Sequence, residues 1–182
     1  MAKECAEGRV IRPLQPALHP TVHISRIGII PKKSTGKWRL IVDLSSPEGF
    51  SVNDGIEEGL CSLSYIFVDH AVRAAMELGQ GALMAKIDVR SAYRIVPVHP
   101  EDQGLLGMMW EGSLFIDTAF PSGLHSAQKI FNAIADTVEW FARQQGVDPL
   151  LHYLDDFFTM GAPDSPYRSV HLTILYYPSL ST

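Results

Sequence analysis

The sequence has few cysteines and no long apolar run. Its two cysteines, Cys5 and Cys61, lie in unrelated contexts in a chain of 182 residues. Neither belongs to a CxxC or Cys/His cluster, so the pattern indicates neither a zinc site nor a disulfide scaffold. No apolar run reaches the ~20 residues of a membrane span, and no apolar stretch resembling a signal peptide follows Met1. We therefore expect an intracellular protein, of the cytoplasm or the nucleus, with no membrane partner.

A strong excess of positive charge is also lacking. The formal net charge is −5, whereas general nucleic-acid binders are usually basic. Five cations nevertheless lie within residues 26–39, and a local basic patch can bind phosphates on an acidic protein. These cations are Arg26, Lys32, Lys33, Lys37 and Arg39. The simpler alternative is that lysines at an exposed strand edge only keep the hairpin soluble.

The periodicity predicts an α+β fold. Residues 1–22 contain three prolines and no sustained period, so we expect an N-terminal arm, followed by one domain over residues 23–182. Alternating or apolar segments predict strands, and 3.6-residue periods predict helices. The expected strands are 24–31, 38–44, 82–89, 94–100, 105–110, 113–120 and the two halves of 150–160; the expected helices are 68–79 and 126–146; a further element is expected over 170–178. Close neighbours in sequence favour a mainly antiparallel sheet backed by helices.

Two adjacent carboxylates, Asp155 and Asp156, interrupt the apolar run 152–158. A strand tolerates this poorly, because neighbouring side chains point to opposite faces and one of them would enter the core. At the tip of a tight hairpin both carboxylates can emerge together and bind a divalent cation such as Mg²⁺. An ordinary turn with two solvated aspartates is the alternative, because short motifs produce false positives.

A third carboxylate, Asp88, ends the apolar segment 82–89. If this strand lies beside the 150–160 hairpin, three carboxylates converge and repel one another strongly. Bound cations relieve such repulsion, and two Mg²⁺ ions held in this way promote phosphoryl transfer. The alternative is that Asp88 only caps the turn that follows it.

Four segments resemble the motifs of reverse transcriptases, in the family's order. Residues 85–93 (AKIDVRSAY) resemble the first catalytic motif, and residues 119–131 (AFPSGLHSAQKIF) resemble the template-and-primer motif. Residues 153–156 (YLDD) match the Tyr-x-Asp-Asp box, and residues 32–39 resemble the fingers hairpin over the incoming nucleotide. The resemblance runs from about residue 22 to 165 and is of the gypsy-like or DIRS-like retrotransposon kind.

The resemblance implies a right-hand polymerase with fingers and palm. Asp88, Asp155 and Asp156 would be the catalytic carboxylates, and two Mg²⁺ ions, or Mn²⁺ in their place, would be the cofactors. Asp88 and Asp155 would be the main metal ligands, assisted by the Val89 carbonyl, and Asp156 would have a lesser role. Lys32 and Arg39 would contact the triphosphate, which arginine can bind through two hydrogen bonds.

The same resemblance implies further contacts to the nucleotide. Backbone amides of Arg90, Ser91 and Ala92 would hold the triphosphate, and Ser122 and Gly123 would shape the pocket. Tyr93 would lie under the sugar and exclude a 2′-hydroxyl, with a core tyrosine as the alternative.

The sequence departs from the family in two places. Ser122 stands where the family usually has a bulky or amide side chain, and His125 and Gln128 are atypical of their motif. Only 26 residues follow Asp156, so we expect a C-terminally truncated domain without a thumb.

Three functions are compatible with these residues. The first is an RNA-directed DNA polymerase whose partners are an RNA or DNA template with its primer, dNTPs and other parts of a retroelement polyprotein. The second is an inactive remnant that acts at most as a binding module. The third is an unrelated Mg²⁺-dependent phosphohydrolase, which the four ordered motifs argue against.

Overall fold

The computed structural model describes residues 1–14, 21–31, 36, 38–63 and 68–164. The expected element over 170–178 and the residues Lys32, Lys33 and Lys37 lie outside this part of the chain. The helices are α1 (Ala2–Ala6), α2 (Val68–Leu78) and α3 (Ala127–Gln144), and short 3-10 turns are η2 (Asn53–Gly55), η3 (Glu58–Leu60), η4 (Ala92–Ile95) and η5 (Gln103–Leu105). The strands are β1 (Val10–Leu14), β2 (Ile24–Pro31), β3 (Trp38–Asp43), β4 (Leu83–Asp88), β5 (Gly107–Trp110), β6 (Ser113–Asp117), β7 (Leu150–Tyr153) and β8 (Asp156–Gly161).

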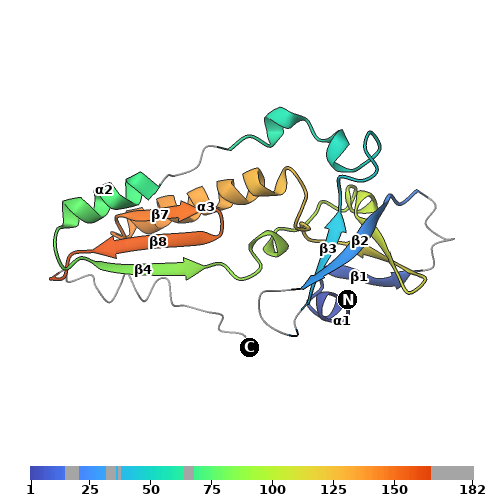
Figure 1. Cartoon of the computed structure of the whole chain (residues 1–182), viewed down its shortest axis with the longest axis horizontal. Coiled ribbons are helices and arrows are strands. Elements are labelled where there is room, and N and C mark those ends of the chain that lie inside the picture. Colours follow the sequence, from blue (N-terminus) through green and yellow to red (C-terminus); the bar gives the residue numbers. More distant parts are fainter. Residues whose placement is uncertain (15–20, 32–35, 37, 64–67, 165–182) are drawn as a thin grey trace. The chain divides into compact units, whose positions relative to one another are not determined.

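The chain forms an α+β fold of two compact units, each with its own sheet (Figure 1). Unit 1 consists of Met1–Ser62 and Ser91–Ile130, and unit 2 consists of Leu63–Arg90 and Phe131–Thr182. Strand pairing is mainly antiparallel, as predicted. Within the described residues, no helix combines the length and apolarity that crossing a membrane requires.

Unit 1 contains a five-stranded sheet with the order β1-β6-β5-β2-β3. The predicted hairpin of β2 and β3 is confirmed, with Ile27 opposite Val42. The hairpin of β5 and β6 is also confirmed, and it turns at Glu111 and Gly112, which both have positive φ. Two consecutive positive φ angles match the twist of the flanking strands, and glycine adopts one of them without strain.

Apolar side chains on both faces of the unit 1 sheet form its core. Leu114 and Met108 are completely buried, and Met108 belongs to a cluster with Val10 and Phe115. A second cluster comprises Leu44, Val98 and Leu106, with Val42, Val52, Phe120 and Leu124 packed against it. This second cluster joins the loop after β3 to the turn before α3.

Unit 2 contains a three-stranded sheet in which β8 lies between β4 and β7. Helix α3 buries Phe131, Ala135 and Ala142, as its 3.6-residue period predicts. His152 of β7 is buried, and its Nε2 lies 2.9 Å from Oδ1 of Asp136 on α3. This contact attaches the predicted Asp-Asp hairpin to the helix.

The N-terminal segment has more structure than an extended arm. Residues 2–6 form α1, and β1 pairs with β6 at the edge of the sheet, with Val10 opposite Asp117. The sequence did not indicate this strand because the strand contains Pro13, and proline in sheets is confined to edge strands and bulges. Residues 94–100 do not form the expected strand. Instead, η4 extends to Ile95, and an isolated bridge joins Pro97 to Ala119.

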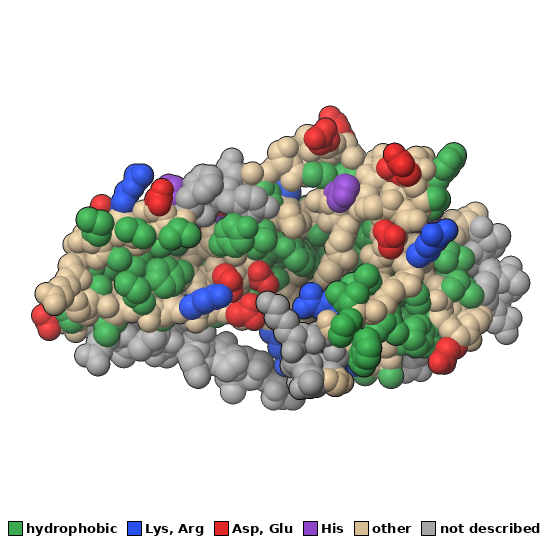
Figure 2. All heavy atoms as spheres, viewed as in Figure 1, with side chains coloured by type: hydrophobic (Ala, Val, Ile, Leu, Met, Phe, Trp, Pro, Cys, Tyr) green, Lys and Arg blue, Asp and Glu red, His purple; other side chains and the backbone are tan. Residues whose placement is uncertain are grey.

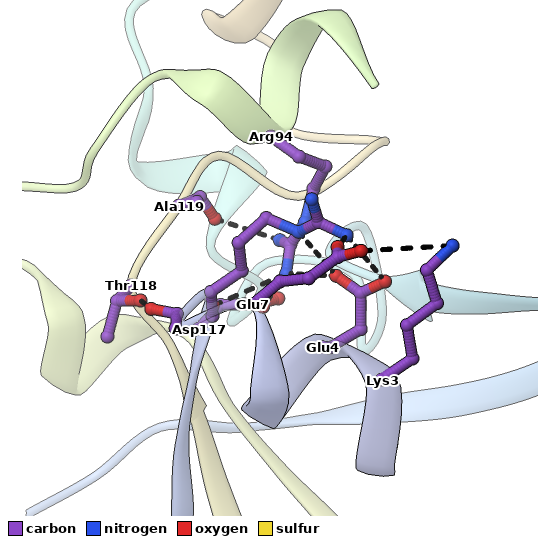
Figure 3. A network of polar contacts seen from close by, with 9 residues as sticks. Lys3, Glu4, Glu7, Arg94, Asp117, Thr118 and Ala119 are labelled. Atoms are coloured by element: carbon purple, nitrogen blue, oxygen red, sulfur yellow. Dashed lines mark hydrogen bonds and ion pairs between the residues drawn. The ribbon is translucent and has the colours of Figure 1, made fainter. Parts of the chain in front are cut away.

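A polar network attaches α1 to the sheet of unit 1 (Figure 3). The Arg94 guanidinium donates to the Ala119 carbonyl at 2.9 Å and to Asp117 Oδ1 at 2.7 Å. It also lies 3.2 Å from Glu4 Oε2, and Glu4 accepts two further hydrogen bonds from Arg9. Because the side chain of Asp117 is only 3% exposed, its carboxylate depends on Arg94 for compensation.

Replacing Arg94 should be strongly destabilising. In Arg94→Ala the buried Asp117 carboxylate loses its cation, and breaking such a buried pair costs about 3 kcal/mol of unfolding free energy. Urea denaturation at neutral pH measures this change. The matched control is Lys3→Ala, because Lys3 forms an exposed ion pair with Glu7 at 3.9 Å, and such pairs contribute less than about 1 kcal/mol. Equal losses in the two variants would contradict the prediction.

Glu4 should make stability fall in acid. Its burial raises the pKa, but the Arg9 hydrogen bond and the attraction of Arg94 and Arg9 outweigh this, so its pKa lies below the ordinary 4.5. A lowered folded-state pKa stabilises the protein above the unfolded pKa, and this contribution disappears as pH falls through the folded value. Burial raises the pKa of Asp117 and the charge of Glu4 raises it further, so removing that charge partly offsets the loss at neutral pH. We expect Glu4→Gln to be destabilised at pH 7 and to approach the parent by about pH 3, as measured by urea unfolding at both pH values. A difference in unfolding free energy between Glu4→Gln and the parent that stays constant with pH would refute this prediction.

Candidate functional site

The Asp-Asp motif lies at the tip of a tight hairpin, as predicted. Strand β7 ends at Tyr153 and β8 begins at Asp156, so only Leu154 and Asp155 form the turn. Leu154 has a φ of 54°, an uncommon backbone conformation for a residue other than glycine. Such conformations persist only where the surrounding structure holds them, and here the paired strands on both sides do so.

Asp88 also lies beside the hairpin, as expected. Strand β4 pairs antiparallel with β8, and the register places Asp88 directly opposite Asp156. The pairing continues beyond the strand, because the Val89 amide donates to the Asp155 carbonyl at 2.9 Å. The backbones that carry all three predicted carboxylates are therefore joined by hydrogen bonds within unit 2.

A lysine side chain partly neutralises these carboxylates. The Lys86 ammonium lies 2.7 Å from Oδ2 of Asp156, and Lys86 lies two residues before Asp88 on the same face of β4. The hydrogen bond to Asp156 raises the pKa of Lys86, slight burial opposes this, and the charges of Asp156, Asp88 and Asp155 add to the increase. Figure 2 shows acidic side chains gathered over the ends of β4 and β8, with a basic side chain beside them.

The donor chemistry suits a hard cation, but the side chains do not form a ready ligand cluster. Carboxylate oxygens are the ligands that Mg²⁺ prefers, and the contact of Lys86 with Asp156 shows that a cation can be placed there. In the part of the chain that the structure describes, however, no three His, Cys, Asp or Glu side chains are arranged to hold a metal ion. The register brings the acidic residues together, and the Asp156 carboxylate forms an ion pair with Lys86.

The other predicted site residues are divided between the two units. Val89 and Arg90 follow Asp88 in unit 2, with Arg90 exposed. The remaining described residues belong to unit 1: Arg39, Ser91, Ala92, Tyr93, Ser122 and Gly123. Lys32 lies outside the described residues.

In unit 1 the predicted nucleotide contacts lie on a strand and two loops. Arg39 is exposed on β3, opposite Ile30. Ser91 has a φ of 58° and precedes η4, in which Ala92 is buried and Tyr93 is half-buried. Arg94, the next residue, attaches η4 to Asp117 and the Ala119 carbonyl.

The turn before α3 contains the remaining predicted contacts, Ser122 and Gly123, which are both exposed. Gly123 has a φ of 110°, a conformation that side-chain-bearing residues rarely adopt. Asn53, which sequence reasoning missed, donates to the Gly123 carbonyl at 2.9 Å. Nothing in the sequence marked this residue, because it lies in a loop of many turn formers, where asparagine is common.

Comparison with solved structures identifies the fold. A mutant of prototype foamy virus protease-reverse transcriptase matches 95% of this chain with a TM-score of 0.69 and 17% identity, over 20% of its own chain. Foamy viral protease-reverse transcriptase with double-stranded DNA matches 96% with a TM-score of 0.67 and 18% identity, over 32% of its chain. The same protein with an RNA/DNA hybrid matches 96% with a TM-score of 0.61 and 19% identity, over 20% of its chain.

The fold is therefore reverse-transcriptase-like, and the chain spans a fifth to a third of the length of these proteins. No family model matches the sequence, and no curated protein matches it significantly.

Proposed function

We propose that this chain is the RNA-directed DNA polymerase domain of a gypsy-like or DIRS-like retroelement. The observation that carries the proposal is the β4–β8 register, which places Asp88 opposite Asp156 beside a turn that holds Asp155, in a reverse-transcriptase-like fold. The primer 3′-oxygen forms a bond to the α-phosphorus of a dNTP, the hydroxyl proton is lost, and the bond to pyrophosphate breaks.

The carboxylates of unit 2 are proposed to hold two Mg²⁺ ions, for which Mn²⁺ can substitute. Asp88 and Asp155 are the main ligands, the Val89 carbonyl assists them, and Asp156 contributes less because Lys86 already pairs with it. When bound, such ions lower the pKa of the attacking hydroxyl and stabilise the leaving oxygens. The chain's own contribution is the register, which fixes the backbone positions of the three acids before substrate arrives.

The residues of unit 1 are proposed to bind the nucleotide and the template. Arg39 and Lys32 contact the triphosphate from the fingers hairpin, and the backbone from Arg90 to Ala92 contributes amide donors. Tyr93 selects against a 2′-hydroxyl, and Ser122 with Gly123 shapes the pocket. The foamy viral relatives were solved with double-stranded DNA and an RNA/DNA hybrid, which supports a template and primer as partners; a retroelement polyprotein is a further proposed partner.

Primer extension tests the proposed chemistry. We expect the chain to extend a DNA primer on an RNA template with Mg²⁺ and dNTPs, and Asp155→Asn to lose about a hundredfold to a thousandfold in rate, as when a principal charge-stabilising group is removed. Asp164→Asn is the matched control, because Asp164 is an exposed acid beyond the end of β8 and should retain the parent rate. Thermal unfolding should be nearly unchanged in both variants.

Two outcomes would refute the polymerase proposal. The first is equal extension by Asp155→Asn and the parent, which would place the chemistry elsewhere. The second is no incorporation of even a single nucleotide by the folded parent chain with either Mg²⁺ or Mn²⁺, which would favour a binding module without catalysis.

Lys86 should compete with a divalent cation for Asp156. Lys86→Met removes the ammonium that lies 2.7 Å from this carboxylate, so Mn²⁺ should bind about fivefold more tightly, the small gain expected when a competing exposed ion pair is removed. Electron paramagnetic resonance of free Mn²⁺ measures the affinity without catalysis. Lys129→Met, which removes a lysine whose ammonium donates to the Gly59 carbonyl at 3.0 Å, should leave the Mn²⁺ affinity unchanged. Unchanged binding in Lys86→Met would contradict competition at this carboxylate.

A further inference from the structure

The side chain of Asn53 joins two loops of unit 1 that are 70 residues apart in sequence. Asn53 belongs to η2, in the loop that follows β3, and is only 4% exposed. Its Nδ2 donates to the Gly123 carbonyl at 2.9 Å and to Ser45 Oγ at 2.8 Å. Its Oδ1 accepts from the His125 amide at 3.0 Å. Both amide protons and the amide oxygen are therefore used.

These bonds are specific for asparagine. An aspartate of the same shape has no proton to donate, so its carboxylate would face the Gly123 carbonyl with oxygen against oxygen, and only the Ser45 hydroxyl could turn to donate to it. A glutamine is one methylene longer in a site that is buried and packed. A buried amide that loses its partners costs more than an exposed one, because no water replaces them.

The bonds also help to fix the turn 121–125, together with a backbone bond from the Ala127 amide to the Leu124 carbonyl at 3.1 Å. Asn53 binds the backbone on both sides of Leu124, at Gly123 and at His125. Within the turn, the Leu124 amide reaches the Pro121 carbonyl only at 3.4 Å. Beneath the turn, Leu124 and Val52 pack on one apolar cluster, which holds the two loops together but does not orient their peptide planes.

The loop around Asn53 is itself anchored. The backbone N–H of Asn53 donates at 3.0 Å to the carbonyl of Leu44, the residue that follows β3. Asp54 accepts from the Ser51 amide at 2.8 Å and from Ser51 Oγ at 2.6 Å, which closes the loop locally. Asn53 thus links the turn that contains Ser122 and Gly123 to a loop that is itself anchored to the sheet.

We propose that Asn53 is a positioning residue that orients the turn 121–125 and thereby sets how tightly the incoming nucleotide fits. This inference rests on the proposed polymerase function. Asn53 touches no substrate, because its side chain is buried and its polar atoms are occupied by Ser45, Gly123 and His125. It should therefore affect the KM for dNTPs more than kcat.

The test compares Asn53→Asp and Asn53→Ala with Asp54→Asn, a control that weakens the same loop but leaves the bonds to the turn intact. Hydrogen exchange of the His125 amide is measured first, because it needs no substrate. We expect exchange about tenfold faster in both Asn53 variants, as for the loss of one hydrogen bond, and little change in Asp54→Asn. If Asn53→Asp does not fold, Asn53→Ala gives the same information without a buried charge.

Single-nucleotide incorporation on an RNA template is measured next with the same proteins. We expect the KM for dNTP to rise about tenfold in the Asn53 variants, as for a lost hydrogen bond, with kcat changed less than twofold, and Asp54→Asn to match the parent. A purely structural role predicts lower melting temperatures with an unchanged KM, and that result would overturn the inference. If the parent chain incorporates no nucleotide, the polymerase proposal fails and this inference fails with it. If the parent chain incorporates nucleotides and the Asn53 variants have the same KM for dNTP, only this inference is refuted.

Discussion

The antiparallel pairing of β4 with β8 is the constraint on which the candidate site depends. Side chains alternate between the two faces of a sheet, so the register that places Asp88 opposite Asp156 also places Ile87 opposite Phe157 on the other face. Phe157 is buried, and burial of this apolar face fixes the register. A slip of one residue would bury the carboxylates and expose the phenyl ring. The acidic cluster is therefore held in place by the hydrophobic effect acting on its neighbours.

Polar side chains fix the geometry of unit 1 in a comparable way, but burying a charged side chain costs free energy. Burial raises the pKa of Asp117 although Arg94 lies 2.7 Å away, so desolvation of this carboxylate outweighs its ion pair. Such a pair contributes more to defining one geometry than to net stability. Asn53 defines geometry with neutral groups and avoids that penalty. The two networks orient η4 and the turn 121–125, two segments that contain predicted nucleotide contacts.

Local features could be predicted from the sequence, and distant pairings could not. The turns at Glu111–Gly112 and Leu154–Asp155 lie between strands that are adjacent in the chain, so turn residues and alternation were sufficient to find both hairpins. The parallel pairing of Ile24 with Gly107 joins segments about 80 residues apart, and no local pattern encodes it. Asp88, Asp155 and Asp156 were identified as a group because their motifs resemble those of reverse transcriptases, and no such motif marked Asn53. Its importance comes from the Gly123 carbonyl, a backbone group with no signature in the sequence.

The discontinuity of unit 1 has a consequence for synthesis of the chain. Strand β1 ends at Leu14, and its partner β6 begins at Ser113. At ribosomal rates of about 5–20 residues per second, the first strand waits roughly 5–20 seconds before its partner has been made. During this time the segments of unit 2 before Arg90 are also produced. An unpaired strand edge invites contacts with other chains, so β1 is open to such contacts until β6 has been translated.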